Sequence, residues 1–335
     1  MQKTEDGRQR TEDRGRKAVP KTPCAMHKKE NIMDTHISKE ILQKVRQVEI
    51  RTNRLVDDTL AGHYHSVFKG RGMDFDEVRE YVPGDDIRTI DWNVTARTGR
   101  TYIKKFTEER ELTIMLIIDV SASGEFGSAS QSKREMMAEI GSVLAFSAMR
   151  NNDKVGLVLF TDEAELYLPP GKGRSHILRV IREILFFQPT GTGTNLAAAM
   201  DFTNQVIKRR AVAFLISDFC LPGDFDATLK DLRPKLRITG RRHDLVAVSV
   251  NDQRERELPD IGLITIEDSE TGEQVELNTS RPDVRSRFRK LAESRGNSLR
   301  RAIRSVGVDM LELSTERSYL ADLRQFFSSR ERRRH

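Results

Sequence analysis

Three oxygen-bearing residues at alternate positions, Asp119, Ser121 and Ser123, follow an apolar run from Leu112 to Ile118. The run is short and contains a single Thr, which predicts a strand buried on both faces of a parallel sheet. A tight loop after such a strand would direct one carboxylate and two hydroxyls at one point. Oxygen ligands of this kind suit a hard cation such as Mg²⁺, which favours octahedral geometry and usually keeps some waters. The spacing therefore makes this loop a candidate metal site.

Two later segments offer further oxygen ligands. Residues 191–196, GTGTNL, contain Thr194 and open an Ala-rich run with helical character. Residues 211–217, AVAFLIS, predict a second buried strand, which ends at Asp218. In a doubly wound sheet, the carboxyl ends of the strands form the ligand crevice. We therefore expect Thr194 and Asp218 at the same sheet edge as the Asp119 loop.

Each of these motifs also has an ordinary structural interpretation. Asp and Ser after a strand often serve only to cap the next helix. Thr194 is similarly placed to cap the helix that we predict through Ile207. Capping and metal binding need not exclude each other, and the D-x-S-x-S pattern alone is weakly specific. The combination of three segments is what favours a metal site.

Together, the five residues resemble the metal-ion-dependent adhesion site of von Willebrand factor type A domains, where D-x-S-x-S is followed by a Thr and by an Asp after a later strand. The matching positions are Asp119, Ser121, Ser123, Thr194 and Asp218. The resemblance implies that the hydroxyls bind Mg²⁺ or Mn²⁺ directly, that the aspartates act largely through water, and that one coordination position is left for a partner's carboxylate. Two aspartates would balance the charge of the ion, and neutral direct ligands leave it able to attract another anionic oxygen.

The composition limits the class of protein to which this site could belong. A chain of 335 residues can hold one large domain or two modest ones, and 37% hydrophobic residues suffice for a core. No run approaches the ~18 apolar residues needed to span a bilayer. Cys24 and Cys220 are the only cysteines, too few for a disulfide framework or a zinc site. This usage favours a reducing, cytoplasmic location.

The net charge of +6 is concentrated at the two ends of the chain. Residues 1–31 contribute +4 and residues 330–335 contribute +3, so the remainder carries −1. We therefore predict a disordered basic tail at 1–35 and a second basic tail at 329–335. Residues 1–31 lack the apolar stretch of a secretory signal. Because Met26 and Met33 offer later starts, we interpret part of the first tail as an over-extended start.

A charged segment before the Asp119 strand carries a second resemblance. Residues 70–97 contain the only Trp, and a solvated loop is their ordinary interpretation. Their pattern resembles the bacterial and archaeal family called domain of unknown function 58. Members join such a segment to a von Willebrand type A-like domain, and their genes commonly neighbour MoxR-type AAA+ ATPases. The resemblance covers roughly residues 62–266 and depends on Tyr81, Pro83-Gly84-Asp85-Asp86, Arg88, Ile90-Asp91-Trp92 and Ala96-Arg97.

The expected fold class is α/β, with a doubly wound, mostly parallel sheet of the von Willebrand factor type A-like, Rossmann-like kind. A small N-terminal extension, charged and β-containing, would occupy residues 36–110 together with a helix at 38–57, and the type A-like domain would occupy 111–328. Apolar periodicity predicts the remaining elements. These are strands at 102–108, 155–160, 166–168, 245–250 and 308–313, helices at 174–187, 226–236, 284–303 and 320–327, a capping box at 132–135, and a hairpin at 263–277.

No motif of a familiar enzyme is present: the chain has no Walker A loop, dinucleotide fingerprint, H-E-x-x-H or G-x-S-x-G. We therefore predict a non-enzymatic, metal-dependent protein-binding module, an adaptor or co-chaperone of a MoxR-type AAA+ ATPase. A nucleic-acid-associated module is one alternative, since Arg281 to Arg304 holds nine Lys/Arg against two acidic residues. A solvated helix face explains the same charges. A metal-dependent phosphoesterase is the other alternative.

Overall fold

The computed structural model describes residues 74–107, 111–128 and 131–334. The predictions of a basic tail at 1–35 and of a helix at 38–57 lie outside these residues. Among the described residues, no helix combines the length and the apolar character that crossing a bilayer requires.

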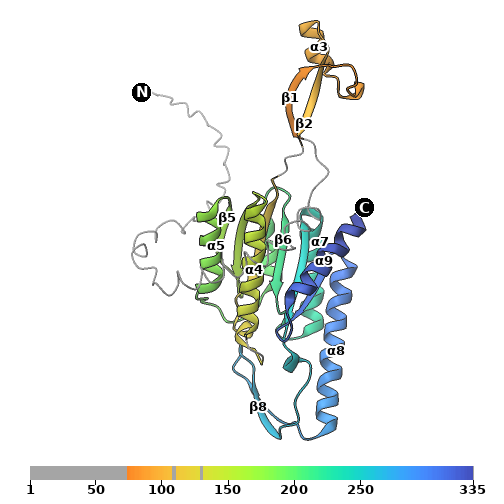
Figure 1. Ribbon diagram of the computed structural model, residues 1–335. Helices are drawn as coiled ribbons and strands as arrows, with labels where there is room; N and C mark the ends of the chain where they lie inside the picture. The colour runs from red at the N-terminus through yellow and green to blue at the C-terminus, as the bar shows by residue number, and fades with distance from the viewer. Residues whose placement is uncertain (1–73, 108–110, 129–130, 335) are drawn as a thin grey trace, which may run out of the picture. The chain divides into compact units, whose positions relative to one another are not determined.

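A six-stranded sheet forms the centre of the main domain (Figure 1), in the order β10-β7-β6-β3-β4-β5. Five strands are parallel, and the edge strand β5 pairs with β4 in antiparallel fashion. This confirms the predicted mostly parallel sheet. The strands are β3 (Thr113–Asp119), β4 (Lys154–Phe160), β5 (Ala164–Gly171), β6 (Val212–Ser217), β7 (Asp244–Asn251) and β10 (Asp309–Ser314).

Helices cover both faces of this sheet, as a doubly wound fold requires. Strand β3 shows how the two cores are divided: Ile114, Leu116 and Ile118 pack in one, while Met115 and Ile117 pack in the other. Since side chains alternate along a strand, a central strand covered on both sides must be apolar throughout. The first core is completed by α4 (Lys133–Arg150), α5 (Arg174–Phe186) and α9 (Tyr319–Arg334), and the second by α6 (Leu196–Val206), α7 (Phe225–Arg242) and α8 (Pro282–Ser305).

The topology places the predicted site residues at one sheet edge. Ile118 of β3 is in register with Ile216 of β6, so Asp119 and Ser217 end neighbouring parallel strands. From β3 the chain moves outward through α4 to β4, and it later returns to β6 on the other side of β3. The gap between β3 and β6 is therefore the topological switch point, where doubly wound folds bind ligands.

The charged segment forms an extension with its own secondary structure. Strands β1 (Asp74–Glu80) and β2 (Tyr102–Thr107) form an antiparallel hairpin, and the segment between them contains η2 (Ile87–Thr89) and α3 (Trp92–Thr98). This confirms the β-containing extension. The solvated-loop interpretation of residues 70–97 is wrong for the described part. Asp91 explains the helix, because its carboxylate accepts hydrogen bonds from Asn93 N and Val94 N and caps α3.

A second hairpin, β8 (Leu263–Glu267) and β9 (Gln274–Asn278), precedes α8. It was predicted from the Gly-containing turn between two short alternating runs. Most of its side chains are exposed. Figure 1 shows it beyond the carboxyl ends of the parallel strands, the end of the domain that carries the candidate site.

Three helices differ from their predictions. Helix α7 does not end at Leu236 but continues through the turn after Pro234 to Arg242, because Leu236 and Thr239 extend its buried face. Helix α9 reaches Arg334, into the segment expected to be a basic tail. There Arg330 is buried and pairs with Asp244 and Asp309. In α8 the expected apolar stripe is buried only near its C-terminal end, and Leu291 is 52% exposed.

Candidate functional site

The first part of the site is the turn after β3. Asp119 is almost fully buried, at 1% exposure. Its Oδ1 accepts a hydrogen bond from Ser121 N at 3.0 Å, and its Oδ2 accepts one from Ser217 Oγ at 2.7 Å. The carboxylate is thus held between the ends of β3 and β6, at the switch point.

Ser121 and Ser123 place their hydroxyls beside each other. Their Oγ atoms are 3.1 Å apart, and both side chains are buried. Ser121 precedes the short helix η3 (Ala122–Glu125), yet its side chain makes no capping hydrogen bond. The next helix, α4, is capped instead by Ser132 in the predicted capping box with Glu135. The capping interpretation therefore does not account for these two serines.

The Thr194 loop lies against the Asp119 loop, because Ala122 N donates to Thr192 O at 3.0 Å. Helix α6 is capped by Asn195, whose Oδ1 accepts from Ala198 N, so the interpretation of Thr194 as the cap is wrong. Thr194 is buried, and its hydroxyl donates a hydrogen bond to Glu270 Oε1 at 2.7 Å. The preceding glycine packs closely against Asp162, since a Cβ at Gly193 would lie 2.1 Å from Asp162 Oδ1 and the Asp162 side chain would have to move.

Asp218 follows β6 directly and is also buried. Its Oδ1 accepts from Cys220 N at 2.9 Å, and its Oδ2 accepts from Lys133 Nζ at 2.6 Å. Phe219 adopts a φ of 55°, and its N–H donates to Ser217 Oγ. This left-handed conformation is unusual for a bulky residue and is typical of functional turns.

Lys133 is one member of this site that sequence reasoning missed. It is the first residue of α4, only 1% exposed, and its ammonium pairs with Asp218 and Glu255. Burial alone would lower the pKa of Lys133, but the two carboxylates outweigh burial and raise it. Its only sequence signal was its position inside a capping box, which did not distinguish it from an exposed lysine.

The site carries more negative than positive charge. Burial and the nearby Asp218 carboxylate raise the pKa of Asp119 to about 7, despite hydrogen bonds from Ser121 and Ser217. If Asp119, Asp218, Glu255 and Glu270 were all ionised, Lys133 would leave a net charge of −3. A bound divalent cation would neutralise most of this excess.

The donor set fits a hard cation of the predicted kind. Asp119, Ser121, Ser123, Thr194 and Asp218 are all buried and supply only oxygen atoms. The site is not a carboxylate or histidine cage: within the described ranges no three His, Cys, Asp or Glu side chains gather in a way that could hold a metal. Metal binding here would therefore depend on the hydroxyls. The assignment of these five residues as Mg²⁺ or Mn²⁺ ligands remains a prediction.

Asp252, after β7, stabilises the loop that follows the Asp119 turn. Its carboxylate accepts from Ser128 N and Oγ at 2.9 and 2.5 Å and from Thr315 Oγ1 at 2.7 Å. Burial would raise the pKa of Asp252, but these hydrogen bonds lower it below its ordinary value. Asp252 also caps η4 (Gln253–Glu255), which places Glu255 against Lys133. This residue was not singled out from the sequence, since its partners lie far along the chain.

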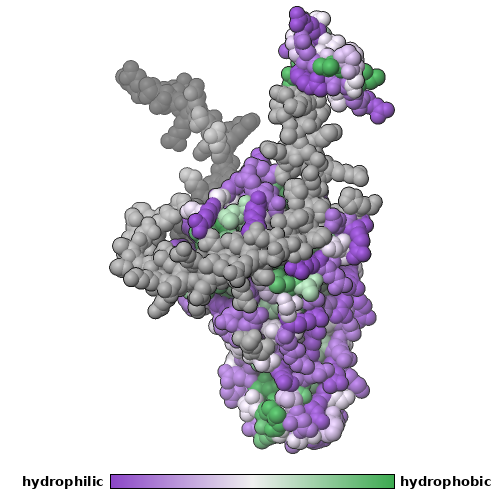
Figure 2. Space-filling view, in the orientation of Figure 1, coloured by the Kyte–Doolittle hydropathy of each residue, from purple (hydrophilic) through white to green (hydrophobic). Residues whose placement is uncertain are grey.

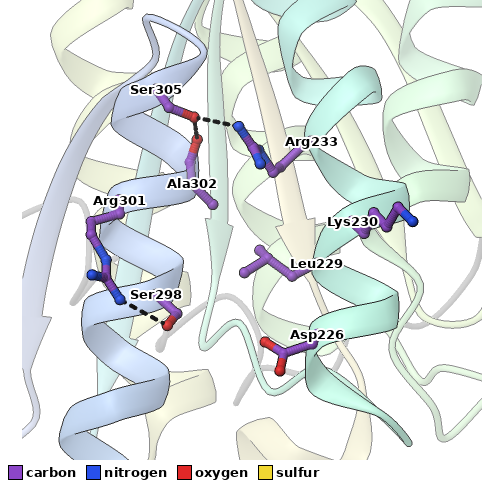
Figure 3. Close-up of a pocket in the computed structure, with 8 residues that line it drawn as sticks. All are labelled: Asp226, Leu229, Lys230, Arg233, Ser298, Arg301, Ala302 and Ser305. Atoms are coloured by element: carbon purple, nitrogen blue, oxygen red, sulfur yellow. Dashed lines mark hydrogen bonds between the residues drawn. The ribbon is translucent and has the colours of Figure 1, made fainter.

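A separate concave region lies between α7 and α8 (Figure 3). Its lining includes the basic residues Lys230, Arg233 and Arg301 and the acidic Asp226. Two of the basic side chains point to neighbouring hydroxyls: Arg233 donates to Ser305 Oγ at 3.1 Å and Arg301 to Ser298 Oγ at 3.3 Å. None of the five predicted ligands lines this region.

The basic stretch of α8 is partly neutralised by neighbouring elements. Four of the nine Lys/Arg between Arg281 and Arg304 form ion pairs within the described structure. Arg300, for example, forms a bidentate ion pair with Glu312 of β10, in which Nε and Nη2 donate to the two carboxylate oxygens at 2.6 and 2.8 Å. This supports the interpretation of α8 as a solvated charged face over that of a nucleic-acid surface. The pairs are Arg281–Asp283, Arg285–Asp260, Arg289–Glu257 and Arg300–Glu312.

The chain is similar to several known proteins. The uncharacterized protein Rv1480 of Mycobacterium tuberculosis is 32% identical over 314 residues, which cover 93% of this chain and 96% of the relative. Among solved structures, BatB from Bacteroides thetaiotaomicron matches 66% of this chain and 99% of its own at 15% identity and a TM-score of 0.40. The SpRpn10 VWA domain matches 64% of this chain and 93% of its own at 15% identity and a TM-score of 0.34.

The family itself is established by the sequence match rather than by these distant folds. The family model extends from the charged hairpin through the whole candidate site and into α8. The chain therefore belongs to the family described as "Protein of unknown function DUF58", whose model matches residues 77–298.

Proposed function

We propose that this protein is a metal-dependent protein-docking module that binds a carboxylate of its partner through an ion at the β3–β6 edge. The observation that carries the proposal is the burial of two aspartates and three hydroxyls on loops that adjoin at this edge of the sheet. Asp119, Ser121, Ser123, Thr194 and Asp218 would hold Mg²⁺ or Mn²⁺. When bound, the ion would supply a positive centre for one anionic oxygen of the partner.

The donor set favours docking over hydrolysis. A hydrolytic metal site needs an open water position and a general base that removes the proton from that water. Here the buried carboxylates are already engaged: Asp119 accepts from Ser121 and Ser217, and Asp218 accepts from Lys133 and Cys220. A panel of phosphate esters with Mg²⁺ and Mn²⁺ tests this point. Asp119-dependent turnover would establish the phosphoesterase alternative instead.

We further propose that the partner is a MoxR-type AAA+ ATPase or its protein client, reached through an acidic side chain. This step is supported by the resemblance of the Tyr81–Arg97 segment to a family whose genes commonly neighbour such ATPases. In this arrangement the ATPase supplies the energy, and this protein acts as adaptor or co-chaperone. Its hairpin extension, with α3 and the exposed Trp92, would offer an additional surface.

The test is affinity purification of the full chain from its native host, with and without EDTA, compared with Asp119→Ala and with Asp231→Ala. Asp231 is an exposed residue of α7 and serves as the matched control. We expect the ATPase or client to be lost with EDTA and with Asp119→Ala and retained with Asp231→Ala. Retention of the same partner by Asp119→Ala in EDTA would contradict the proposal.

One observation favours the nucleic-acid alternative enough to merit its own test: the three basic side chains that line the region between α7 and α8 (Figure 3). Nucleic-acid binding would depend on these cations and would weaken steeply with salt. It would not respond to EDTA. Retention of DNA or RNA that is salt-sensitive, unaffected by EDTA and lost in Lys230→Gln/Arg233→Gln would favour this alternative.

A further inference from the structure

Glu270, in the turn of the β8–β9 hairpin, contacts one of the predicted metal ligands. Thr194 Oγ1 donates a hydrogen bond to Glu270 Oε1 at 2.7 Å, across 76 residues of sequence. Glu270 is partly buried. A glutamate from a distant hairpin is thus directed at the oxygen cluster.

The hairpin turn is built to hold Glu270 in this position. Asp268 Oδ1 accepts hydrogen bonds from Glu270 N at 2.9 Å and from Thr271 N at 3.1 Å. The turn is closed by Gly272 N, which donates to Asp268 O at 2.7 Å, with Gly272 at a φ of 73°. This φ favours glycine. The backbone of Glu270 is therefore fixed by its own turn, independently of the contact with Thr194.

A carboxylate that is partly removed from water is stabilised by a nearby cation. The hydrogen bond that Glu270 accepts from Thr194 comes from a neutral group. Buried carboxylates are ordinarily paired with a cation or coordinate a metal. Lys133, the cation of the site, is already engaged by Asp218 and Glu255. The geometry thus brings an anionic oxygen to the hydroxyl that is predicted to bind the ion.

We propose that Glu270 is a built-in carboxylate ligand, which takes in cis the coordination position that a partner's carboxylate would occupy. This inference rests on the proposed metal-dependent docking function and adds its regulation: the site is closed by its own hairpin until Glu270 is withdrawn. A partner with an acidic side chain would then have to compete with Glu270, so docking is weaker than the ion alone would permit.

The hairpin is anchored at its base and lightly packed along its strands. Thr279 is fully buried at the base, where its N and Oγ1 donate to Gly262 O at 2.8 and 2.7 Å. Along the strands, Leu263 is 68% and Val275 49% exposed. Figure 2 shows the corresponding hydrophobic patch at the hairpin end of the molecule. Moving the turn would therefore cost little buried surface while the base stays in place.

The experiment measures binding of Mn²⁺ alone to the full chain by calorimetry and by water-proton relaxation. Four proteins are compared: wild type, Glu270→Gln, Glu276→Gln and Asp119→Asn. Gln at position 270 can still accept the Thr194 hydrogen bond, so the hairpin contact is kept while the anionic ligand is lost. Glu276→Gln removes the same charge from an exposed position of the same hairpin. It therefore controls for long-range electrostatics.

If Glu270 is a ligand, Glu270→Gln should weaken Mn²⁺ binding by at least about 10-fold, since even groups that only orient metal ligands change affinity by this much. The relaxivity of the bound ion should rise by the contribution of one added inner-sphere water. Added acetate should then bind the Glu270→Gln complex more tightly than the wild-type complex. Glu276→Gln should behave as wild type in all three measurements.

Two results would overturn the inference, and they have different meanings. If wild type binds Mn²⁺ in an Asp119-dependent way and Glu270→Gln shows unchanged affinity and relaxivity, Glu270 is not a ligand, while the metal site stands. If wild type binds Mn²⁺ no better than Asp119→Asn, the proposed docking function itself fails, and the inference fails with it. Circular dichroism of each variant verifies that the fold is retained.

Discussion

The sheet edge at β3 and β6 and the outer face of α8 both concentrate charge, but they use it differently. At the edge, Lys133 is 1% exposed and pairs with Asp218, which is also buried. Nine Lys/Arg lie between Arg281 and Arg304, eight of them in α8, and pairs such as Arg281–Asp283 and Arg289–Glu257 are exposed to solvent. Water screens exposed pairs, so each contributes little, whereas a buried charge must be matched by a partner. The number of charges is therefore a poor guide to their importance, and burial is the better one.

The largest effect is expected from breaking the buried pair. Lys133→Met would leave Asp218 without its cation in a water-excluded site, and we expect a loss of about 3–5 kcal/mol in the free energy of unfolding. Lys290→Met, on the exposed face of α8, is the matched control and should change stability by less than about 0.5 kcal/mol. Urea denaturation of both variants measures the difference. Equal effects would remove the distinction drawn between the two regions.

The next largest effect is the stabilisation expected from a metal ion at the β3–β6 edge of the sheet. If Asp119 belongs to a metal site, Mg²⁺ or Mn²⁺ at a hundred times its dissociation constant should stabilise the wild-type protein by about 2.7 kcal/mol. Asp119→Asn should lose this stabilisation. Thermal unfolding with added metal and with EDTA is the measurement, and Asp231→Ala is the control. A metal-induced shift of equal size in Asp119→Asn would place the ion elsewhere in the protein.

The titration of Asp119 provides a smaller effect, with a defined sign. Its pKa is raised from 3.8 to about 7 in the folded protein by burial and by Asp218. Between these two values the folded state holds a proton that the unfolded state has released. In EDTA, stability should therefore fall as pH rises toward 7, by up to about 1.4 kcal/mol per pH unit, and level off above it. Below pH 4 this contribution is fully present.

Comparison with Asp119→Asn separates the contribution of Asp119 to the pH dependence of stability from the contributions of all other titratable groups. The difference in unfolding free energy between wild type and variant should decrease from pH 5 to 7 and then remain constant. Urea denaturation at half-unit pH intervals would give the curve. A difference that is flat over this range would mean that Asp119 is already ionised at pH 5, and that the burial argument overstates the cost of its charge.

The smallest effect is expected on α8. Arg287→Gln/Lys290→Gln removes two exposed charges and should leave the unfolding free energy within about ±0.5 kcal/mol of wild type. Fluorescence anisotropy with a labelled oligonucleotide at 50 and 200 mM salt tests for a functional role. We expect no salt-sensitive binding that depends on these residues. A marked loss of such binding would show that this face, and not the sheet edge, carries the function.

Much of the fold could be predicted because its signals are local. The apolar runs at β3 and β6, the capping box at Ser132 and the Gly-containing turn of the β8–β9 hairpin are each visible within a short stretch of sequence, and the structure has all of them. The predicted ends of two helices were wrong because burial, and not the local sequence, decides where these helices end. Helix α7 continues past Leu236 because its buried face continues. Helix α9 reaches Arg334 because Arg330 is buried and forms ion pairs with two aspartates.

Some features of the candidate site could likewise be predicted from the sequence, and others could not. The types and spacing of Asp119, Ser121 and Ser123 predicted a candidate site at the carboxyl end of β3, and the parallel topology brought Asp218 to the same sheet edge. The choice of Asn195 over Thr194 as the cap of α6 could not be read from two adjacent residues that both favour capping. Only the fold decided that Asn195 caps α6 and that the Thr194 hydroxyl donates to Glu270 instead.

By itself, the sequence determined the strand-forming apolar runs, the oxygen-rich turns at their ends and the family, because each of these depends on neighbouring residues or on a linear pattern. The tertiary structure alone decided that Lys133 is a buried cation and that Glu270 reaches Thr194. Lys133 is 85 residues from its partner Asp218, and Thr194 is 76 residues from Glu270. Side-chain contacts over such separations leave no periodic trace, since they form only when packing has brought distant segments to the same edge.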